Sequence, residues 1–369
     1  MFYSVLLIGY VFQMFNKKIL FYSFALILVF MSFFRYGIGI DYFAYEFLFD
    51  RLQNSVSAEF KYGVDEQEIG FRLIGTFLKN IGFTYQYYLA FFASINLIYI
   101  VKICKKCSKN PTLSLFIFFS FYYVTWTLSG VRQGVVITVG LYYLLKYIKE
   151  NKPLRLIAVS LLLSLIHSSA VVLILFYFLS KLNFKKSTLI VLSGIGAIAS
   201  VVPTGFIINK FSWLPFYDRF FGYTDTAFAL NIFDFQSIAR AVFLIVALIF
   251  YDYYSEQGEM SKKIITIYIL SIILYFFLSF SELAAARLAI YGKFLDIIIF
   301  ANVLYLYKEW INRLIYIVAI FVLCTLYLFK ETNAQINESV VNEHTIAPYV
   351  SIFNKDEFNY KSEYYNLVD

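Results

Sequence analysis

Residues 19–34 read ILFYSFALILVFMSFF, and residues 34–51 continue as FRYGIGIDYFAYEFLFDR. The first stretch is an unbroken apolar run, of the kind that crosses a hydrocarbon core about 30 Å thick. The second stretch places an arginine, two glycines, an aspartate and several tyrosines directly after that run. Ionisable groups at the end of an apolar segment are costly unless they are paired or solvated, so this junction is a candidate functional site.

The composition of the whole chain indicates an integral membrane protein. The 369 residues are 61% hydrophobic and 15% charged, whereas a soluble domain is about half apolar and about a quarter charged. Repeated apolar runs predict an all-α, polytopic membrane protein with about twelve transmembrane helices, outer-face loops and interfacial helices. The predicted spans are roughly 2–15, 19–34, 84–101, 111–128, 131–148, 154–167, 169–184, 187–208, 238–254, 263–280, 287–306 and 313–330.

Lysine and arginine residues gather in alternate loops, and this pattern predicts the orientation of the chain. Seventeen of the 31 basic residues lie in six short loops, which begin near Lys17, Lys102, Lys146, Lys181, Lys262 and Lys308. The positive-inside rule makes these loops cytoplasmic and places both termini outside. The net charge of +7 is therefore accounted for by topology, and no nucleic acid partner is expected.

We expect residues 1–330 to form one transmembrane domain and residues 331–369 to form an extracytoplasmic tail. Two predicted outer loops, 35–83 and 209–237, are longer than turns. The second half of the segment AEFKYGVDEQEIGFRLIGTFL in the first loop predicts an amphipathic helix at the membrane interface. The aromatic and acidic residues of the second loop suit sugar rings, but an ordinary aromatic belt is the favoured interpretation.

Several polar residues are predicted to gather on the outer face of the membrane. The sequences that carry them are RYGIGID, TLSGVRQGVV, SLIHSSAVV and SELAAARLAIYGKF. Purely structural roles remain open for several of these residues. Arg35 could snorkel to the interface, His167 could cap a turn, and Glu282 could pair with Arg287. Arg132 is harder to explain in this way, because long apolar runs flank it on both sides and a lone arginine there needs an anion.

Arginine and a nearby base together indicate chemistry on a phosphate-linked sugar. The planar guanidinium fits phosphate and diphosphate oxygens, and a carboxylate or histidine can accept the proton of a sugar hydroxyl. Guanidinium groups can stabilise a diphosphate leaving group without a metal ion, so neither a metal nor a cofactor is expected. The CxxC formed by Cys104 and Cys107 has no second pair or nearby histidine and is interpreted as a reduced cytoplasmic turn.

The sequence resembles the EpsG/Wzy-like polysaccharide polymerase family. The motifs that carry the resemblance are FRYGIGIDYFAY, EIGF at 68–71, SGVRQG at 129–134, IHSSA at 166–170, and the pair Arg287 and Tyr291. The resemblance implies a GT-C-like glycosyltransferase of the bacterial cytoplasmic (inner) membrane. Such an enzyme joins polyprenyl-diphosphate-linked oligosaccharide repeat units, as donor and acceptor, into O-antigen, capsule or exopolysaccharide on the periplasmic or outer side. A chain-length-regulating co-polymerase and a flippase are the further partners that it implies.

Each candidate residue has an expected role in this reaction. The expected catalytic residues are Asp41, Arg132 and His167. The expected substrate-binding residues are Arg35, Tyr42, Tyr45, Glu68, Gln133, Arg287 and Tyr291. The arginines are expected to hold the donor diphosphate, and either the aspartate or the histidine to remove the acceptor proton. The glutamate and the tyrosines are expected to orient sugars.

Two other functions compete with this interpretation. A flippase or transporter of the same lipid-linked oligosaccharide could also carry arginines, but it should place charge at mid-span and show two related halves. A membrane acyltransferase would need a histidine near a cytoplasmic acyl donor, whereas His167 is predicted to lie outside.

Overall fold

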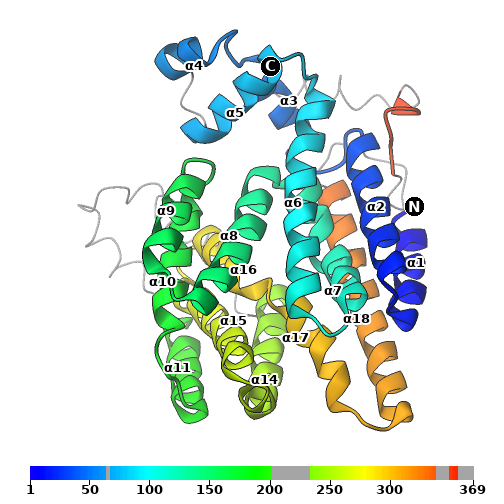
Figure 1. The fold of residues 1–369 in the computed structure, drawn as a ribbon, viewed down its shortest axis with the longest axis vertical. Coiled ribbons are helices and arrows are strands. Elements are labelled where there is room, and N and C mark those ends of the chain that lie inside the picture. Colours follow the sequence, from blue (N-terminus) through cyan, green and yellow to red (C-terminus); the bar gives the residue numbers. More distant parts are fainter. Residues whose placement is uncertain (64–66, 202–232, 338–348, 356–369) are drawn as a thin grey trace. The chain divides into compact units, whose positions relative to one another are not determined.

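The computed structural model describes residues 1–63, 67–201, 233–337 and 349–355. Within these ranges the elements are helices, joined by turns, with one isolated bridge between Arg35 and Ser351 (Figure 1). The all-α prediction is confirmed for this part of the chain. The first of two compact units contains Met1–Tyr142, Leu161–Ser168 and Phe300–Asp369, and the second contains Tyr143–Ser160 and Ser169–Ile299. Most of the predicted outer loop 209–237 lies outside the described residues.

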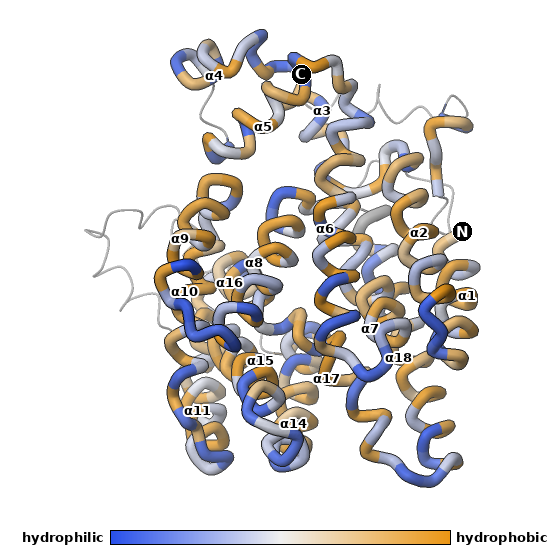
Figure 2. The backbone as a smooth tube through the Cα atoms, in the orientation of Figure 1, coloured by the Kyte–Doolittle hydropathy of each residue, from blue (hydrophilic) through white to orange (hydrophobic). Residues whose placement is uncertain are grey.

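Among the residues that the structure describes, five helices are long and apolar enough to cross a membrane, or up to six if a bent pair counts as one span. The five are Tyr85–Cys107, Pro111–Ser129, Phe235–Glu256, Glu259–Phe277 and Trp310–Ala334. The bent pair is Glu282–Lys293 with Asp296–Leu306, which meet at an angle of 44°. Several other predicted spans correspond to shorter apolar helices, so the total of about twelve spans stays a prediction. Hydrophilic residues concentrate at helix ends and connecting turns (Figure 2).

The first unit is built on α6, α7 and the π-helical segment η1, which pack against α1, α2 and α18. These elements are α1 (Phe2–Phe15), α2 (Lys18–Phe34), α6 (Tyr85–Cys107), α7 (Pro111–Phe118), η1 (Phe119–Ser129) and α18 (Trp310–Asn337). Local sequence explains their limits. Asn16 takes a left-handed conformation with φ 44° at the end of α1. Asn110 accepts a hydrogen bond from the Leu113 amide at 3.0 Å, directly before a proline that starts α7.

Three short helices lie at the N-terminal end of α6 (Figure 1). They are α3 (Tyr42–Asp50), α4 (Val56–Tyr62) and α5 (Ile69–Asn80). A buried ion pair joins two of them, because Nη1 of Arg72 lies 2.9 Å from Oε1 of Glu59. The predicted amphipathic helix is confirmed as α5, while its place at a membrane interface stays a prediction.

The second unit is organised around α15, which packs against α11, α14 and α16. The elements that lie wholly within it are α10 (Val172–Leu179), α11 (Lys186–Ala199), α14 (Phe235–Glu256), α15 (Glu259–Phe277) and α16 (Glu282–Lys293). Three further elements, α9 (Pro153–Ser164), η2 (Ser168–Val171) and α17 (Asp296–Val303), each have residues in both units. Helix α8 (Val131–Glu150) begins in the first unit and ends in the second. Most residues of α15 are buried, as expected for a helix that is apolar on all sides.

The structure describes part of the predicted tail 331–369, whose extracytoplasmic location stays a prediction. Helix α18 continues to Asn337, and residues 349–355 return to the end of α2. The Val350 carbonyl accepts a hydrogen bond from the Tyr36 amide, and the Ile352 amide donates one to the Phe34 carbonyl, both at 2.9 Å. Sequence periodicity could not predict this contact, because it joins segments more than 300 residues apart.

Candidate active site

The Arg132 guanidinium and the Glu68 carboxylate form an ion pair in the first unit. Nη1 of Arg132 lies 2.7 Å from Oε2 of Glu68. The two side chains are 22% and 16% exposed, so the pair is shielded yet still in contact with solvent. Nε of Arg132 is buried and has no hydrogen-bond partner among the described residues. A guanidinium with an N–H group that has no protein acceptor is suited to binding an anion.

Glu68 also holds the turn that follows α9. The backbone N–H of Ser168 donates to Oε1 of Glu68 at 3.0 Å. Each oxygen of the carboxylate therefore has a partner, with the guanidinium on one and the amide on the other. This arrangement fixes the carboxylate and, through it, the orientation of Arg132.

Gly70 explains how these two parts of the chain approach so closely. Its N–H donates to the Leu165 carbonyl oxygen at 2.8 Å. A Cβ atom added at this position would lie 2.7 Å from the same oxygen, which is too short for a carbon–oxygen contact. Only glycine lets the start of α5 lie against the end of α9 in this way.

A second close contact brings the GIGID loop onto the end of η1. Gly39 has a φ of +105°, and a Cβ there would lie 2.7 Å from the Leu128 carbonyl oxygen. The Asp41 amide makes a long hydrogen bond of 3.4 Å to Oγ of Ser129. Segments with π-helical geometry are frequent at functional sites. Here the segment ends just before α8, the helix that carries Arg132.

Two aromatic residues lie close to Arg132. The Cζ atom of Arg132 lies 5.6 Å from the centre of the Phe71 ring, within the range of a cation–π contact. Tyr45 is buried and packs on Phe71 with ring centres 5.9 Å apart. Burial raises the pKa of the Tyr45 hydroxyl, although Arg132 opposes the change. The hydroxyl therefore stays protonated near neutral pH.

The Glu68 carboxyl titrates below its ordinary range. Partial burial would raise its pKa, but the Arg132 guanidinium, the Ser168 amide and His167 outweigh this effect and lower the pKa. Glu68 is consequently ionised at neutral pH, which maintains the ion pair with Arg132.

His167 and Gln133 lie next to this ion pair in the chain, and both are buried. His167 is 6% exposed and sits in the turn that supplies the Ser168 amide. Gln133 is 5% exposed and follows Arg132 on α8. Both side chains have interaction partners in the structure. Asp41 is half-buried. The structure thus gathers Glu68, Arg132 and the His167 turn, with Asp41 anchored on the end of η1.

Arg35 and Tyr42 belong to a separate buried cluster of the first unit. Nη1 of Arg35 donates to the Ile38 carbonyl at 3.0 Å, and its Cζ lies 5.7 Å from the centre of the Tyr42 ring. Nε and Nη2 of Arg35 have no hydrogen-bond partner among the described residues. The Tyr42 hydroxyl donates to Oε1 of Gln86 at 3.2 Å. Arg35 is 0% exposed and is bonded within the 35–42 turn, and its predicted substrate-binding role stays a prediction.

Arg287 and Tyr291 both lie on α16, in the second unit. Arg287 is exposed. Tyr291 is fully buried, and its hydroxyl lies 2.9 Å from Oγ of Ser169. The hydrogen bond ties the start of the α10 region to α16. A role for Arg287 and Tyr291 in a common site with Arg132 stays a prediction.

A sequence model of the EpsG family matches residues 18–351. The chain belongs to the EpsG family. The match contains every candidate residue discussed above, and membership of this family suggests a polysaccharide polymerase. Comparison with curated proteins and with solved structures gave no match.

The EpsG-family motifs identified the charged side chains of the site but not all of their partners. The Ser168 amide was not expected as a ligand of Glu68, although free amides are common where the chain turns between helices. Phe71 was also missed as a neighbour of Arg132, although it belongs to the EIGF motif. Neither partner could be assigned from sequence, because a contact between residues 61 or more positions apart depends on the fold.

The described residues contain no group of three or more histidine, cysteine, aspartate or glutamate side chains that could hold a metal ion. Cys104 is buried and Cys107 is half-buried at the end of α6. The donors near Arg132 are N–H groups, which suit a phosphate or diphosphate ligand.

Proposed function

We propose that this EpsG-family protein is a membrane glycosyltransferase that joins polyprenyl-diphosphate-linked oligosaccharide repeat units. The observation that carries the proposal is the Arg132–Glu68 pair, which offers a fixed, partly exposed guanidinium to an anionic ligand. The long apolar helices provide a setting for a lipid-linked substrate. The positive-inside pattern supports an active site on the outer face of the cytoplasmic membrane.

The proposed reaction is a glycosyl transfer in which all atoms are accounted for. The hydroxyl oxygen of the acceptor sugar attacks the anomeric carbon of the donor glycan, and a new carbon–oxygen bond forms. The bond between that carbon and the diphosphate breaks, and the diphosphate leaves with the electron pair. The acceptor proton passes to a protein base. Arg132 stabilises the negative charge that develops on the diphosphate.

Glu68 acts in this scheme as a positioning residue. Its two oxygens are occupied by Arg132 and by the Ser168 amide, so it is better placed to orient the guanidinium than to bind a sugar directly. The base is Asp41 or His167. Asp41 is half-buried, and its charge raises the pKa of the nearby Tyr45 hydroxyl. His167 directly precedes Ser168, whose amide donates to Glu68.

The remaining candidate residues have supporting roles in the proposal. The substrate-binding roles expected from the sequence are kept for Tyr45, Gln133, Arg287 and Tyr291. Arg35 and Tyr42 maintain the turn that presents Asp41. The product is O-antigen, capsule or exopolysaccharide, with a flippase and a co-polymerase as separate proteins.

The decisive experiment is deletion of the gene in its host, with the surface glycan resolved on a gel. Collapse of the ladder to a single repeat unit is the expected result, because units still reach the surface but are not joined. Complete loss of surface units, with lipid-linked units accumulating inside the cell, would identify a flippase instead. An unchanged ladder would overturn both functions.

A further inference from the structure

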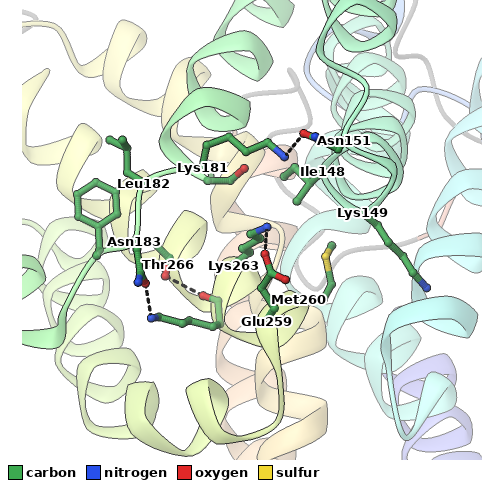
Figure 3. A pocket seen from close by; sticks show the side chains of 13 residues that line it. Ile148, Lys149, Asn151, Lys181, Leu182, Asn183, Glu259, Met260, Lys263 and Thr266 are labelled. Atoms are coloured by element: carbon green, nitrogen blue, oxygen red, sulfur yellow. Dashed lines mark hydrogen bonds and ion pairs between the residues drawn. The ribbon is translucent and has the colours of Figure 1, made fainter.

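A cavity of about 1000 Å³ lies in the second unit, where α8 ends and α15 begins (Figure 3). Four lysines and one carboxylate line it: Lys149, Lys181, Lys262, Lys263 and Glu259. Its volume is within the range of about 300–1000 Å³ that is typical of small-molecule sites. None of the residues assigned to glycosyl transfer lines this cavity.

Neutral asparagines hold two of the lysines. Nζ of Lys181 donates to Oδ1 of Asn151 at 2.8 Å, and Nζ of Lys262 donates to Oδ1 of Asn183 at 2.6 Å (Figure 3). An amide oxygen orients an ammonium group but does not neutralise it. These hydrogen bonds therefore orient both lysines at the edge of the cavity without supplying a negative charge.

The single carboxylate is too exposed to balance the lysines. Glu259 pairs with Lys263 one helical turn later, but its side chain is 81% exposed, whereas that of Lys263 is 20% exposed. Burial lowers the pKa of Lys181, and the positive charge of Lys263 lowers it further, while Glu259 opposes the change. The lysines are thus close enough to repel one another, and a bound anion would relieve this repulsion.

The position of Lys262 and Lys263 adds to the excess of positive charge. Both lie in the first turns of α15, where the helix dipole already favours anions over cations. No side chain caps the first amides of this helix, because the preceding residue is Gly258. An anion in the cavity would interact with these lysines and with the positive end of the helix.

Apolar side chains also line the cavity and lie among the polar ones, including Ile148, Leu182 and Met260 (Figure 3). A cavity that combines lysines with apolar surface suits a charged group attached to an apolar one. The positive-inside pattern places these loops on the cytoplasmic side, where anionic phospholipid headgroups are abundant. We propose that this cavity binds a phosphate group, carried either by an anionic phospholipid or by a free phosphate compound.

The test compares two variants that lose the same charge. The cavity variant carries Lys181→Gln, Lys262→Gln and Lys263→Gln. The control variant carries Lys102→Gln, Lys106→Gln and Lys109→Gln, three exposed lysines of another predicted cytoplasmic loop that do not line the cavity. Each full-length protein is purified in detergent. Binding of phosphatidylglycerol is measured by native mass spectrometry, and binding of inorganic pyrophosphate by calorimetry.

The wild type and the control variant should bind at least one probe equally well, and the cavity variant should bind it at least tenfold more weakly. Binding of phosphatidylglycerol alone would identify a lipid headgroup as the source, and binding of pyrophosphate would identify a free phosphate. Equal weakening in both variants, or no binding by the wild type, would overturn the proposal. If the triple variant does not fold, the single variant Lys181→Gln takes its place in the comparison, because Lys181 is exposed. These readouts do not depend on polymer synthesis, so they fail or succeed independently of the proposed polymerase activity.

Discussion

At the scale of single residues, the planar shape of the Arg132 side chain is the first property to test. Arg132→Lys keeps the positive charge but loses the fork that can hold two phosphate oxygens while still contacting Glu68. A hydrogen bond to a charged group contributes about 1.5–3 kcal/mol, so the rate of polymerisation should fall about 10- to 100-fold. The measurement is the incorporation of lipid-linked repeat units by the purified protein.

Arg155→Lys is the matched control for this change, because Arg155 is an exposed arginine on α9. That variant should polymerise at the wild-type rate. Normal polymer from Arg132→Lys would remove Arg132 from the active site, provided that both variants are present in the membrane in equal amounts.

The charge of Glu68 should matter over the whole physiological pH range. The pKa of the Glu68 carboxyl is lowered in the folded protein. The stabilisation that the ionised carboxylate provides is therefore complete above the ordinary carboxyl pKa of about 4.3, and it is lost only as the pH falls through the lower pKa of the folded state. Glu68→Gln should therefore reduce the rate about tenfold or more at every pH between 5 and 8, because Arg132 loses a charged partner. A wild-type rate for this variant at neutral pH would contradict the positioning role.

The pH profile of the wild type also separates the two candidate bases. A histidine base gives a rate that falls as the pH decreases from neutral, because protonation removes the base, whereas an aspartate base gives a level rate over the same range. In the first case the Glu68→Gln profile should shift to lower pH, because removal of the carboxylate destabilises the protonated His167.

The sequence indicated which residues are candidates for the site better than it indicated which residues contact one another. Arg132 stood out because long apolar segments flank it, and that reasoning needs no fold. The pairing with Glu68 could not be predicted from spacing, since 64 residues separate the two. For Arg35 the sequence left an interfacial and a substrate-binding interpretation open, and it could not show that the side chain is fully buried beside the Tyr42 ring.

At the scale of the elements, the contact between α5 and the end of α9 depends on Gly70. Gly70→Ala should destabilise the protein by about 1–3 kcal/mol, because the new methyl group overlaps the Leu165 carbonyl. Thermal unfolding in detergent measures the change. Gly194→Ala is the matched control: nothing lies within 4 Å of a Cβ there, so on helix propensity alone it should stabilise α11 by up to about 1 kcal/mol. Equal effects of the two changes would argue against the close contact.

The helices themselves were largely predictable, and their irregularities were not. The apolar runs located α6, α14 and α15 within a few residues. The π-helical geometry of η1 could not be predicted, because it leaves the apolar character of the run unchanged. The sequence predicted one span over about 287–306, and the 44° bend between α16 and α17 inside it could not be predicted from the apolar run. Two buried charged residues lie at this break, with Nζ of Lys293 3.8 Å from Oδ2 of Asp296.

At the scale of the whole molecule, residues 349–355 link the end of the chain to α2. Removal of residues 338–369 should lower the unfolding free energy by about 2–4 kcal/mol, since it breaks two backbone hydrogen bonds and the bond from the Tyr349 hydroxyl to the Met31 carbonyl. Removal of residues 356–369 alone should have a much smaller effect, because these bonds remain. Thermal unfolding of both truncated proteins measures the difference, and equal stabilities would show that the contact contributes little.

The orientation in the membrane decides whether the proposed active site faces the outside. Ser57 and Gln257 are both exposed, and the basic-residue pattern places the first outside and the second in the cytoplasm. Cys104 and Cys324 are buried, so only Cys107 needs replacement by serine before new cysteines are introduced. In spheroplasts with an intact cytoplasmic membrane, a membrane-impermeant maleimide should label Ser57→Cys. It should label Gln257→Cys only after the cytoplasmic membrane is permeabilised. The reverse pattern would place the loop that carries Glu68 in the cytoplasm and would contradict polymerisation at the outer face. Labelling of both from outside would contradict the predicted topology between these two positions.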